Sequence, residues 1–232
     1  MQYRLAIFSL LFSAFSVWAQ MPIQPLKTEK HVSQALLKIH QAAPHSAFCQ
    51  EPIDQLGNFV SQETPSFVKK PSVIWYPVVS KKMLAQHRPC YQEAICVDKN
   101  HQRFKGLRCC KQLDNLYNIM LHDLHNRLPI HPKLQKILNQ THYDTVQDKY
   151  HCETFYGLFY DKKQKILEVP NRLKGEIARI NLYMADAYSL PMSQSTRLLY
   201  TQWHQAFPPS KWELEKNSLV AEIQGNRNPF VG

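Results

Sequence analysis

Three histidines and an aspartate near the middle of the chain are residues with the chemistry to bind a metal. They are His122, Asp123, His125 and His131. His122 and His125 are three positions apart, a spacing that places two side chains on one face of a helix. Imidazole nitrogen is a common ligand of zinc and other transition metals. One interpretation is therefore a transition-metal site, and the other is a polar scaffold around the core.

The cysteines offer a second kind of chemistry, because thiols form disulfides or bind zinc. The chain has six of them, an even number, and no two are spaced as Cys-x-x-Cys. An adjacent pair of cysteines rarely serves one tetrahedral zinc site. We therefore expect three disulfides whose connectivity the sequence leaves open. They would use Cys49, Cys90, Cys96, Cys109, Cys110 and Cys152.

The chain is strongly basic, with 28 Lys and Arg residues against 18 Asp and Glu residues and a formal net charge of +10. That balance favours an acidic partner such as nucleic acid, anionic lipid or a surface polymer. Basic residues gather in one stretch, where they can follow a phosphate backbone or form a solvated face. They are Lys69, Lys70, Lys81, Lys82, Arg88, Lys99, Arg103, Lys105 and Arg108.

The first 19 residues have the pattern of a secretory signal peptide. Arg4 precedes an apolar run, and the segment ends with Val17 and Ala19 in the positions expected before a cleavage site. The run is too short for a comfortable membrane span, and no later segment replaces it. We expect a secreted or periplasmic protein without a transmembrane segment, in which residues 20–232 form a single domain.

The elements that must position these residues are mostly helices. We expect five helical segments, the first three from apolar residues at helical spacing and the last two from Ser193 as an N-cap and Gly225 as a stop. These are residues 28–43, 109–126, 173–190, 193–207 and 210–224. Strands are expected within residues 72–80 and 153–161, which are β-branched and aromatic, and Pro77 indicates an edge strand or a break. Residues 127–150 are expected to be a loop with a short helix, so the fold class is α+β with a small sheet.

Several of these segments resemble the bacterial endonuclease I family. The most specific is "IQGNRNPFV" at residues 223–231, and "LKGEIARINLYMADAYSL" precedes it at residues 173–190. "CCKQLDNLYNIMLHDLHN" is similar to the Cys-rich helix of the family, and "SQALLKIHQAAPHSAFC" to its N-terminal helix and first cysteine. The resemblance runs from about residue 32 to the end of the chain.

The resemblance implies a disulfide-containing, metal-dependent nuclease that is secreted or periplasmic and cuts DNA and often RNA. In the family, a strand-strand-helix core of the ββα-metal type holds one Mg²⁺. A histidine is the general base, and a glutamate and an asparagine hold the metal. A phosphodiester needs an activated nucleophile and a cation where negative charge develops.

This sequence departs from the family at the residues that carry the chemistry. Val73 to Lys81 aligns without a gap to the family segment that contains the Glu-His pair, and the register is fixed by Arg88 and Cys90. The glutamate position is then Tyr76 and the histidine position is Pro77. A further acidic position is Leu121, and the metal-binding asparagine falls on Gln135. We therefore expect no Mg²⁺ here, and Tyr76 to fill the metal pocket or to stack on a base.

The resemblance also suggests roles for other residues. Arg88, Lys81 and Lys82 lie beside the site segment and are candidates for phosphate contacts. Arg179 either contacts phosphate or is buried and braces a loop through carboxylates. His125 and Asp123 match the scaffold motif Asp-Leu-His-Asn, and Cys90 is expected to pair with Cys109 or Cys110.

Three functions are compatible with this sequence. The first is a member of the family with weak or absent cleavage that acts by binding. The second is an active but divergent endonuclease with a relocated site. The third is a secreted factor that binds protein and not nucleic acid.

Overall fold

The computed structural model describes residues 19–60, 70–146, 153–155 and 158–232 of the chain. The expected signal peptide lies almost entirely outside the described residues, as does Cys152. The fold is a mixed α+β arrangement in which helices predominate and three small sheets contribute, as expected. Among the described residues, no helix combines the length and apolar character needed to cross a membrane.

A short antiparallel ladder followed by a helix forms the part of the fold that matters most for function. Strand β1 (Ile74–Pro77) pairs with β4 (Arg127–Ile130), with Tyr76 opposite Leu128 and Pro77 opposite Arg127. The 3-10 helix η2 (Pro132–Leu134) and the helix α6 (Gln135–Leu138) follow β4 directly. The expected strand-strand-helix unit is therefore present. Pro77 is tolerated because this sheet has only two strands.

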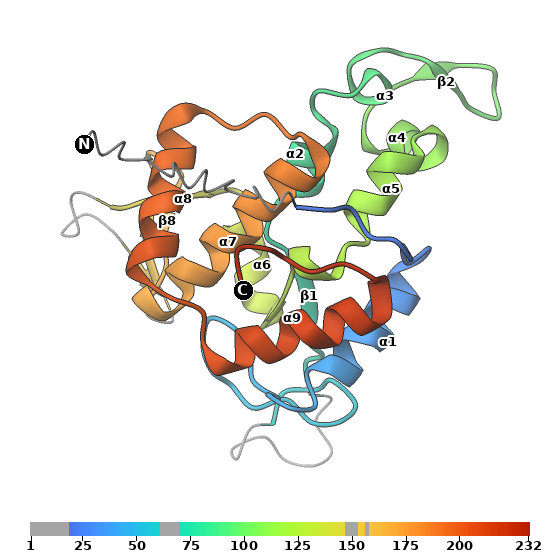
Figure 1. The fold of residues 1–232 in the computed structure, drawn as a ribbon. Helices are drawn as coiled ribbons and strands as arrows, with labels where there is room; N and C mark the ends of the chain where they lie inside the picture. The colour runs from blue at the N-terminus through green and yellow to red at the C-terminus, as the bar shows by residue number, and fades with distance from the viewer. Residues whose placement is uncertain (1–18, 61–69, 147–152, 156–157) are drawn as a thin grey trace, which may run out of the picture.

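The segment between β1 and β4 projects from the body of the molecule as an arm (Figure 1). Two disulfides hold it together, Cys90–Cys110 and Cys96–Cys109. The first is one of the two expected pairings of Cys90. Cys49 has a free thiol in this structure, so the expected third disulfide is not formed within the described residues. The elements of this segment are α2 (Lys81–Ala85), α3 (Pro89–Gln92), β2 (Cys96–Val97), β3 (Arg103–Phe104), α4 (Leu107–Leu113), α5 (Asn115–Leu121) and η1 (Leu124–Asn126).

Four longer helices form the body around the ladder, and their ends agree with the sequence signals. Thr28 caps the N-terminus of α1 (Glu29–Ile39), and Ser193 caps the N-terminus of α8 (Gln194–Ala206). Gly225 ends the last helix with a φ of 81°, a left-handed conformation that favours glycine. The helix α7 (Asn171–Tyr188) is buried along most of its length and packs against α8. The four are α1 (Glu29–Ile39), α7 (Asn171–Tyr188), α8 (Gln194–Ala206) and α9 (Lys211–Gln224).

A second sheet of four strands lies beside α8 (Figure 1). Its order is β5-β8-β7-β6, and only the β5–β8 pair is parallel. The expected strand at residues 153–161 is a hairpin of two strands instead. The strands are β5 (His142–Tyr143), β6 (Glu153–Phe155), β7 (Leu158–Asp161) and β8 (Ile166–Glu168).

Two further expectations about secondary structure were wrong. The single helix expected over residues 109–126 is broken at Asp114, which ends α4 and caps α5 by accepting a hydrogen bond from the Tyr117 amide. Residues 127–130 were expected to be loop but form β4. Pro129 hides this strand in the sequence, because proline is a poor strand former outside edge positions.

Candidate functional site

A cleft of about 610 Å³ opens where β1, α1 and α6 meet. Tyr76 and Pro77 reach it from β1, and Gln135 reaches it from the first position of α6. Three of the four positions that the resemblance aligned with the catalytic residues of the family are thus brought to one place. The cleft is lined by Glu29, Ser33, Val73, Ile74, Trp75, Tyr76, Pro77, Ser80, Lys81, Lys82, Leu107, Arg127, Gln135 and Asn139.

Tyr76 and Pro77 provide neither a general base nor an anionic ligand at this cleft. Tyr76 is 3% exposed, and burial raises the pKa of its phenol above the ordinary value of 10. A phenol with a raised pKa stays protonated at neutral pH and is a poor ligand for Mg²⁺. Pro77 has no titratable group. Neither side chain can therefore activate water by accepting a proton.

Arg127 forms the positive centre of the cleft. Its guanidinium donates to the carbonyl of Trp75 at 2.9 Å and to the carbonyl of Leu121. It also donates to the Glu29 carboxylate at 3.0 Å, which ties α1 to β4. The Nε atom of Arg127 is buried without a hydrogen-bond partner among the described residues. Arg127 is thus held in place while part of its donor capacity remains unused.

Two exposed lysines extend this positive charge along the rim of the cleft. Lys81 and Lys82 begin α2, and Ser80 caps that helix by accepting a hydrogen bond from the Met83 amide. The cap fixes the direction in which α2 leaves the ladder. Together with the buried Arg127, the lysines give three cations against one carboxylate, that of Glu29, among the described residues that line the cleft. This arrangement suits an anion such as phosphate.

The residues of the cleft do not fit a Mg²⁺ ion. Mg²⁺ prefers oxygen ligands and is usually held by one or two carboxylates. Glu29 is the only carboxylate among the described residues that line the cleft, and it is paired with Arg127. The amides of Gln135 and Asn139 supply only neutral oxygens. We therefore derive no step through a metal at this position.

The three histidines considered as metal ligands do not converge. The Nε2 atom of His125 lies 3.2 Å from the carbonyl oxygen of Asn226, whereas the Nδ1 atom of His131 accepts a hydrogen bond from the Lys133 amide. Burial lowers the pKa of both His122 and His125. Within the described ranges, no group of three or more His, Cys, Asp or Glu residues is arranged to hold a metal ion. The transition-metal interpretation is therefore not supported.

The motif Asp-Leu-His-Asn acts as a scaffold, as the resemblance implied. Asp123 accepts hydrogen bonds from the Tyr183 hydroxyl at 2.6 Å and the Tyr188 hydroxyl at 2.7 Å, both on α7. Asn126 accepts from the amide of Val79 at 2.7 Å and donates to the carbonyl of Val79 at 3.0 Å. The motif thus fixes both the helix behind the ladder and the chain that leaves β1.

Two arginines expected to contact phosphate are committed elsewhere. Arg179 is 1% exposed and pairs with Glu213, an arrangement that favours the buried brace over the phosphate contact. Arg88 forms a two-pronged ion pair with Asp114 and does not line the cleft. Burial opposes ionisation of Asp114, but hydrogen bonds from Arg88 and the Tyr117 amide lower its pKa overall.

Sequence reasoning missed the two residues that contribute most to the charge inside the cleft. Arg127 stands opposite Pro77 in the ladder, so the strand pairing alone would have revealed it. Glu29 reaches the cleft through the packing of α1, for which the sequence carries no local signal. Leu121, in contrast, is a buried residue at the end of α5, and only its carbonyl takes part, as an acceptor for Arg127.

The structure thus combines a basic cleft, a strand-strand-helix unit and a neighbouring segment that two disulfides reinforce. A family model described as endonuclease I matches residues 92–232. The chain belongs to the endonuclease I family.

The relatives with curated names agree with this assignment. One is "Endonuclease-1" of Buchnera aphidicola subsp. Acyrthosiphon pisum, which is 27% identical over 84% of this chain and 76% of that protein. A "Periplasmic deoxyribonuclease" of Aeromonas hydrophila is 25% identical over 90% of this chain and 86% of its own length. An "Extracellular deoxyribonuclease" of the same organism is 25% identical over 89% of this chain and 88% of its own length.

Proposed function

We propose that this protein is exported and binds nucleic acid in the cleft, with little or no metal-dependent cleavage. The observation that carries the proposal is the composition of the cleft. Lys81, Lys82 and Arg127 supply positive charge, and the cleft is also lined by Tyr76 and Pro77, which the resemblance aligns with the metal ligand and the general base of the family. Binding of a phosphate backbone needs only the first set of residues, and hydrolysis needs the second.

Export is supported by the disulfides and by the relatives. Disulfides persist in oxidising compartments such as the periplasm and the cell exterior. Two of the relatives are named as periplasmic and extracellular deoxyribonucleases. DNA is therefore the first nucleic acid to test.

The decisive experiment measures cleavage and binding with the same disulfide-intact protein. Plasmid DNA is incubated with the protein and Mg²⁺, with a chelator as control, and binding to a labelled duplex is followed at several salt concentrations. We expect binding that weakens steeply with salt and no metal-dependent nicking. Efficient nicking that the chelator abolishes would favour an active divergent nuclease, and absence of binding at low salt would contradict the proposal.

A further inference from the structure

The arm carries a short two-stranded ribbon at its far end (Figure 1). We call residues 95–105, which contain β2 and β3, the ribbon. Its turn is closed by Asp98, whose carboxylate accepts hydrogen bonds from two backbone amides within the turn, at 2.8 and 2.9 Å. The Cys96–Cys109 disulfide ties the ribbon to α4. The ribbon therefore has a fixed shape before any partner binds.

The two faces of the ribbon differ. Val97 pairs with Arg103 and Cys96 pairs with Phe104, and successive side chains of a strand point to opposite faces. Phe104 lies under the guanidinium of Arg108, 4.2 Å from its ring centroid, on the face that the disulfide joins to α4. Val97 and Arg103 are exposed on the other face. Within the described ranges, the side chain of Arg103 forms no hydrogen bond or ion pair.

Positive charge is concentrated on and beside the ribbon. Residues 93–113 contain five Lys and Arg residues against Glu93 and Asp98, and Asp98 is engaged in the turn. An excess of three positive charges on one projecting segment suits a polyanion. The five cations are all exposed, and they are Lys99, Arg103, Lys105, Arg108 and Lys111.

The cleft leads onto this part of the arm. Leu107, the first residue of α4, lines the cleft, and Arg108 and Lys111 follow on the same helix. The helix α2, which carries Lys81 and Lys82, packs against α4. The cations of the cleft and those of the arm are therefore neighbours, so a polyanion bound by the first set can continue along the second.

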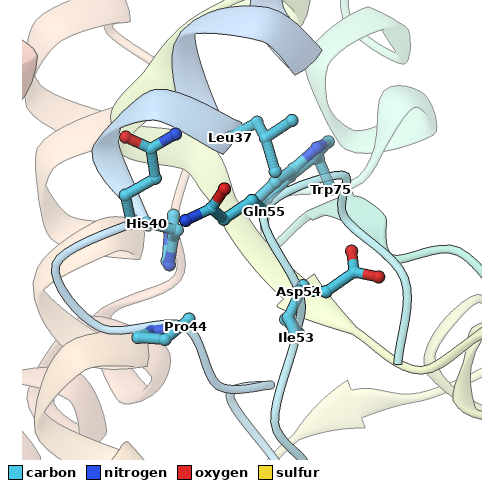
Figure 2. Close-up of a pocket in the computed structure, with 8 residues that line it drawn as sticks. Leu37, His40, Pro44, Ile53, Asp54, Gln55 and Trp75 are labelled. Atoms are coloured by element: carbon cyan, nitrogen blue, oxygen red, sulfur yellow. The ribbon is translucent and has the colours of Figure 1, made fainter. Parts of the chain in front are cut away.

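The cavity next to the cleft offers no comparable charge. Trp75 borders both the cleft and a second cavity of about 610 Å³ at the C-terminal end of α1 (Figure 2). Asp54 is the only charged residue among the described residues that line this second cavity. Burial lowers the pKa of His40, which also lines it, to about 3, so this histidine is neutral at pH 7. A polyanion that extends beyond the cleft is therefore drawn toward the arm.

The shape of the ribbon selects the kind of nucleic acid. The major groove of B-form DNA is about 12 Å wide and admits a two-stranded ribbon. The minor groove is about 6 Å wide and leaves no room for two strands about 4.8 Å apart with their side chains. In an A-form RNA duplex the major groove is too narrow for side chains to read. A ribbon of this kind therefore fits the major groove of a DNA duplex.

We propose that the ribbon lies in the major groove of a DNA duplex whose backbone is bound in the cleft. Arg103 donates to base acceptors in the groove, and Val97 beside it contacts the methyl group of a thymine. Lys99, at the turn, contacts phosphates that border the groove. This inference rests on the proposed function and adds selection of the B-form duplex to binding of the backbone.

Three labelled duplexes of one sequence test the groove contact with the disulfide-intact protein. The first is plain DNA and the second is RNA. The third is DNA in which glucosylated 5-hydroxymethylcytosine replaces every cytosine, so that the sugar fills the major groove while the backbone is unchanged. We expect the wild-type protein to bind plain DNA roughly tenfold tighter than either of the others, since one good contact to a base edge contributes about that factor. Fluorescence anisotropy measures the three affinities.

Lys99→Ala with Arg103→Ala should remove this preference. Both side chains are exposed, so the fold should persist, and thermal unfolding verifies it. Affinity for plain DNA should fall roughly tenfold, to that for the RNA duplex, which should change by less than about twofold. The matched control is Lys163→Ala with Lys165→Ala, which removes the same charge from exposed positions between β7 and β8 and should keep the preference.

The outcomes separate the ribbon from the cleft. If the glucosylated duplex binds as tightly as plain DNA, or if the ribbon variant keeps the preference for DNA over RNA, the groove contact is wrong even when the cleft binds both duplexes. Lys81→Ala with Lys82→Ala should weaken binding of DNA and RNA alike. If it weakens neither while the ribbon variant still loses the preference, backbone binding in the cleft is wrong and the groove contact stands.

Anionic lipid is the competing partner for an exposed face that combines cations with an apolar residue. Sedimentation with phosphatidylglycerol vesicles tests it. We expect the wild-type protein and the ribbon variant to bind these vesicles equally, because only the general charge of the protein contributes. If the ribbon variant loses vesicle binding while it keeps the preference for plain DNA, the ribbon is a membrane contact and the proposal is overturned.

Discussion

Tyr76 and Pro77 line a cleft whose other charged residues suit a phosphate group. The phenol is buried and protonated, and the proline cannot titrate, so neither residue can replace a glutamate or a histidine in hydrolysis. Arg127 remains beneath them with an unused donor. At the scale of single residues, the proposed binding and the cleavage typical of the family would therefore depend on different side chains.

This separation predicts that substitutions at three positions can raise cleavage without rebuilding the cleft. The triple variant Tyr76→Glu, Pro77→His and Gln135→Asn places the residue types of the family at positions that already line one cavity. We expect Mg²⁺-dependent nicking of plasmid DNA to rise by roughly 10²-fold or more, because a positioned general base alone contributes about 10²- to 10⁴-fold.

The matched control for this variant is Tyr76→Gln, Pro77→Gln and Gln135→Asn. It changes the same positions without adding a carboxylate or an imidazole, and it should remain inactive. Equal activity in the two triple variants, or strong activity in the wild-type protein, would show that cleavage does not use these positions.

The neutral state of His40 predicts a specific loss of stability in acid. The pKa of His40 falls from an ordinary value of 6.5 to about 3 in the folded protein. The unfolded chain therefore binds the proton first, and stability is lost as the pH falls from about 6.5 toward 3. When the pH falls from about 7 to about 4, protonation of this histidine in the unfolded chain should lower the free energy of unfolding by about 3 kcal/mol.

Urea unfolding of the wild-type protein and of His40→Leu at both pH values checks this prediction. The variant should lose about 3 kcal/mol less than the wild type on acidification, since all other titrating groups are shared. Parallel losses in the two proteins would mean that His40 is protonated in the folded state.

At the scale of elements, the close approach of α7 to the end of α8 holds the body together. A Cβ atom built on Gly175 would lie 2.1 Å from the backbone oxygen of Phe207. The same oxygen accepts a hydrogen bond from the Arg179 guanidinium at 2.7 Å. Glycine is therefore required in α7 at the point where the chain leaving α8 crosses it.

Gly175→Ala should destabilise the protein in spite of the higher helix propensity of alanine. Overpacking against backbone costs about 1 to 3 kcal/mol or more, and the displaced Phe207 carbonyl would also weaken the Arg179 brace. Chemical denaturation should show a loss of about 3 kcal/mol. Asn171→Ala, at the exposed start of α7, is the control and should change stability little. An unchanged midpoint for Gly175→Ala would contradict the close approach.

The elements differ in how well the sequence predicts them, for physical reasons. The helices α1, α8 and α9 begin at clear capping residues, and the sequence locates them well. Strand β4 contains Pro129 and was missed because its partner β1 is distant in sequence. The sequence predicted only some of the residues that line the cleft. Its β1 residues follow from the resemblance, whereas Glu29 and Arg127 depend on strand register and helix docking.

At the scale of the whole molecule, the net charge of +10 attracts any polyanion, so the cleft must be distinguished from the general field. The salt dependence of binding makes this distinction, because each neutralised phosphate of duplex DNA contributes about 0.9 to the slope of log K against log salt. Only cations that contact the DNA change this slope.

Lys81→Ala with Lys82→Ala should reduce the salt slope by about 2. The control is Lys163→Ala with Lys165→Ala, which removes the same charge from the turn between β7 and β8, outside the cleft. These two control substitutions should weaken DNA binding only slightly and leave the salt slope unchanged. Fluorescence anisotropy with a labelled duplex at several salt concentrations measures both. Identical slopes for the two pairs would place the DNA somewhere other than the cleft.

The position of the disulfides also has a consequence for the order of folding. The chain must close a loop of residues 78–126 before β1 can pair with β4, and both disulfides lie within that loop. The Cys90–Cys110 disulfide shortens this loop, because it joins two residues that are 20 positions apart. Since the entropy of loop closure grows only with the logarithm of loop length, the shorter loop favours closure by about half a kcal/mol. Oxidation therefore speeds assembly of the ladder only slightly, and the ladder can form in a newly made chain before its cysteines have paired.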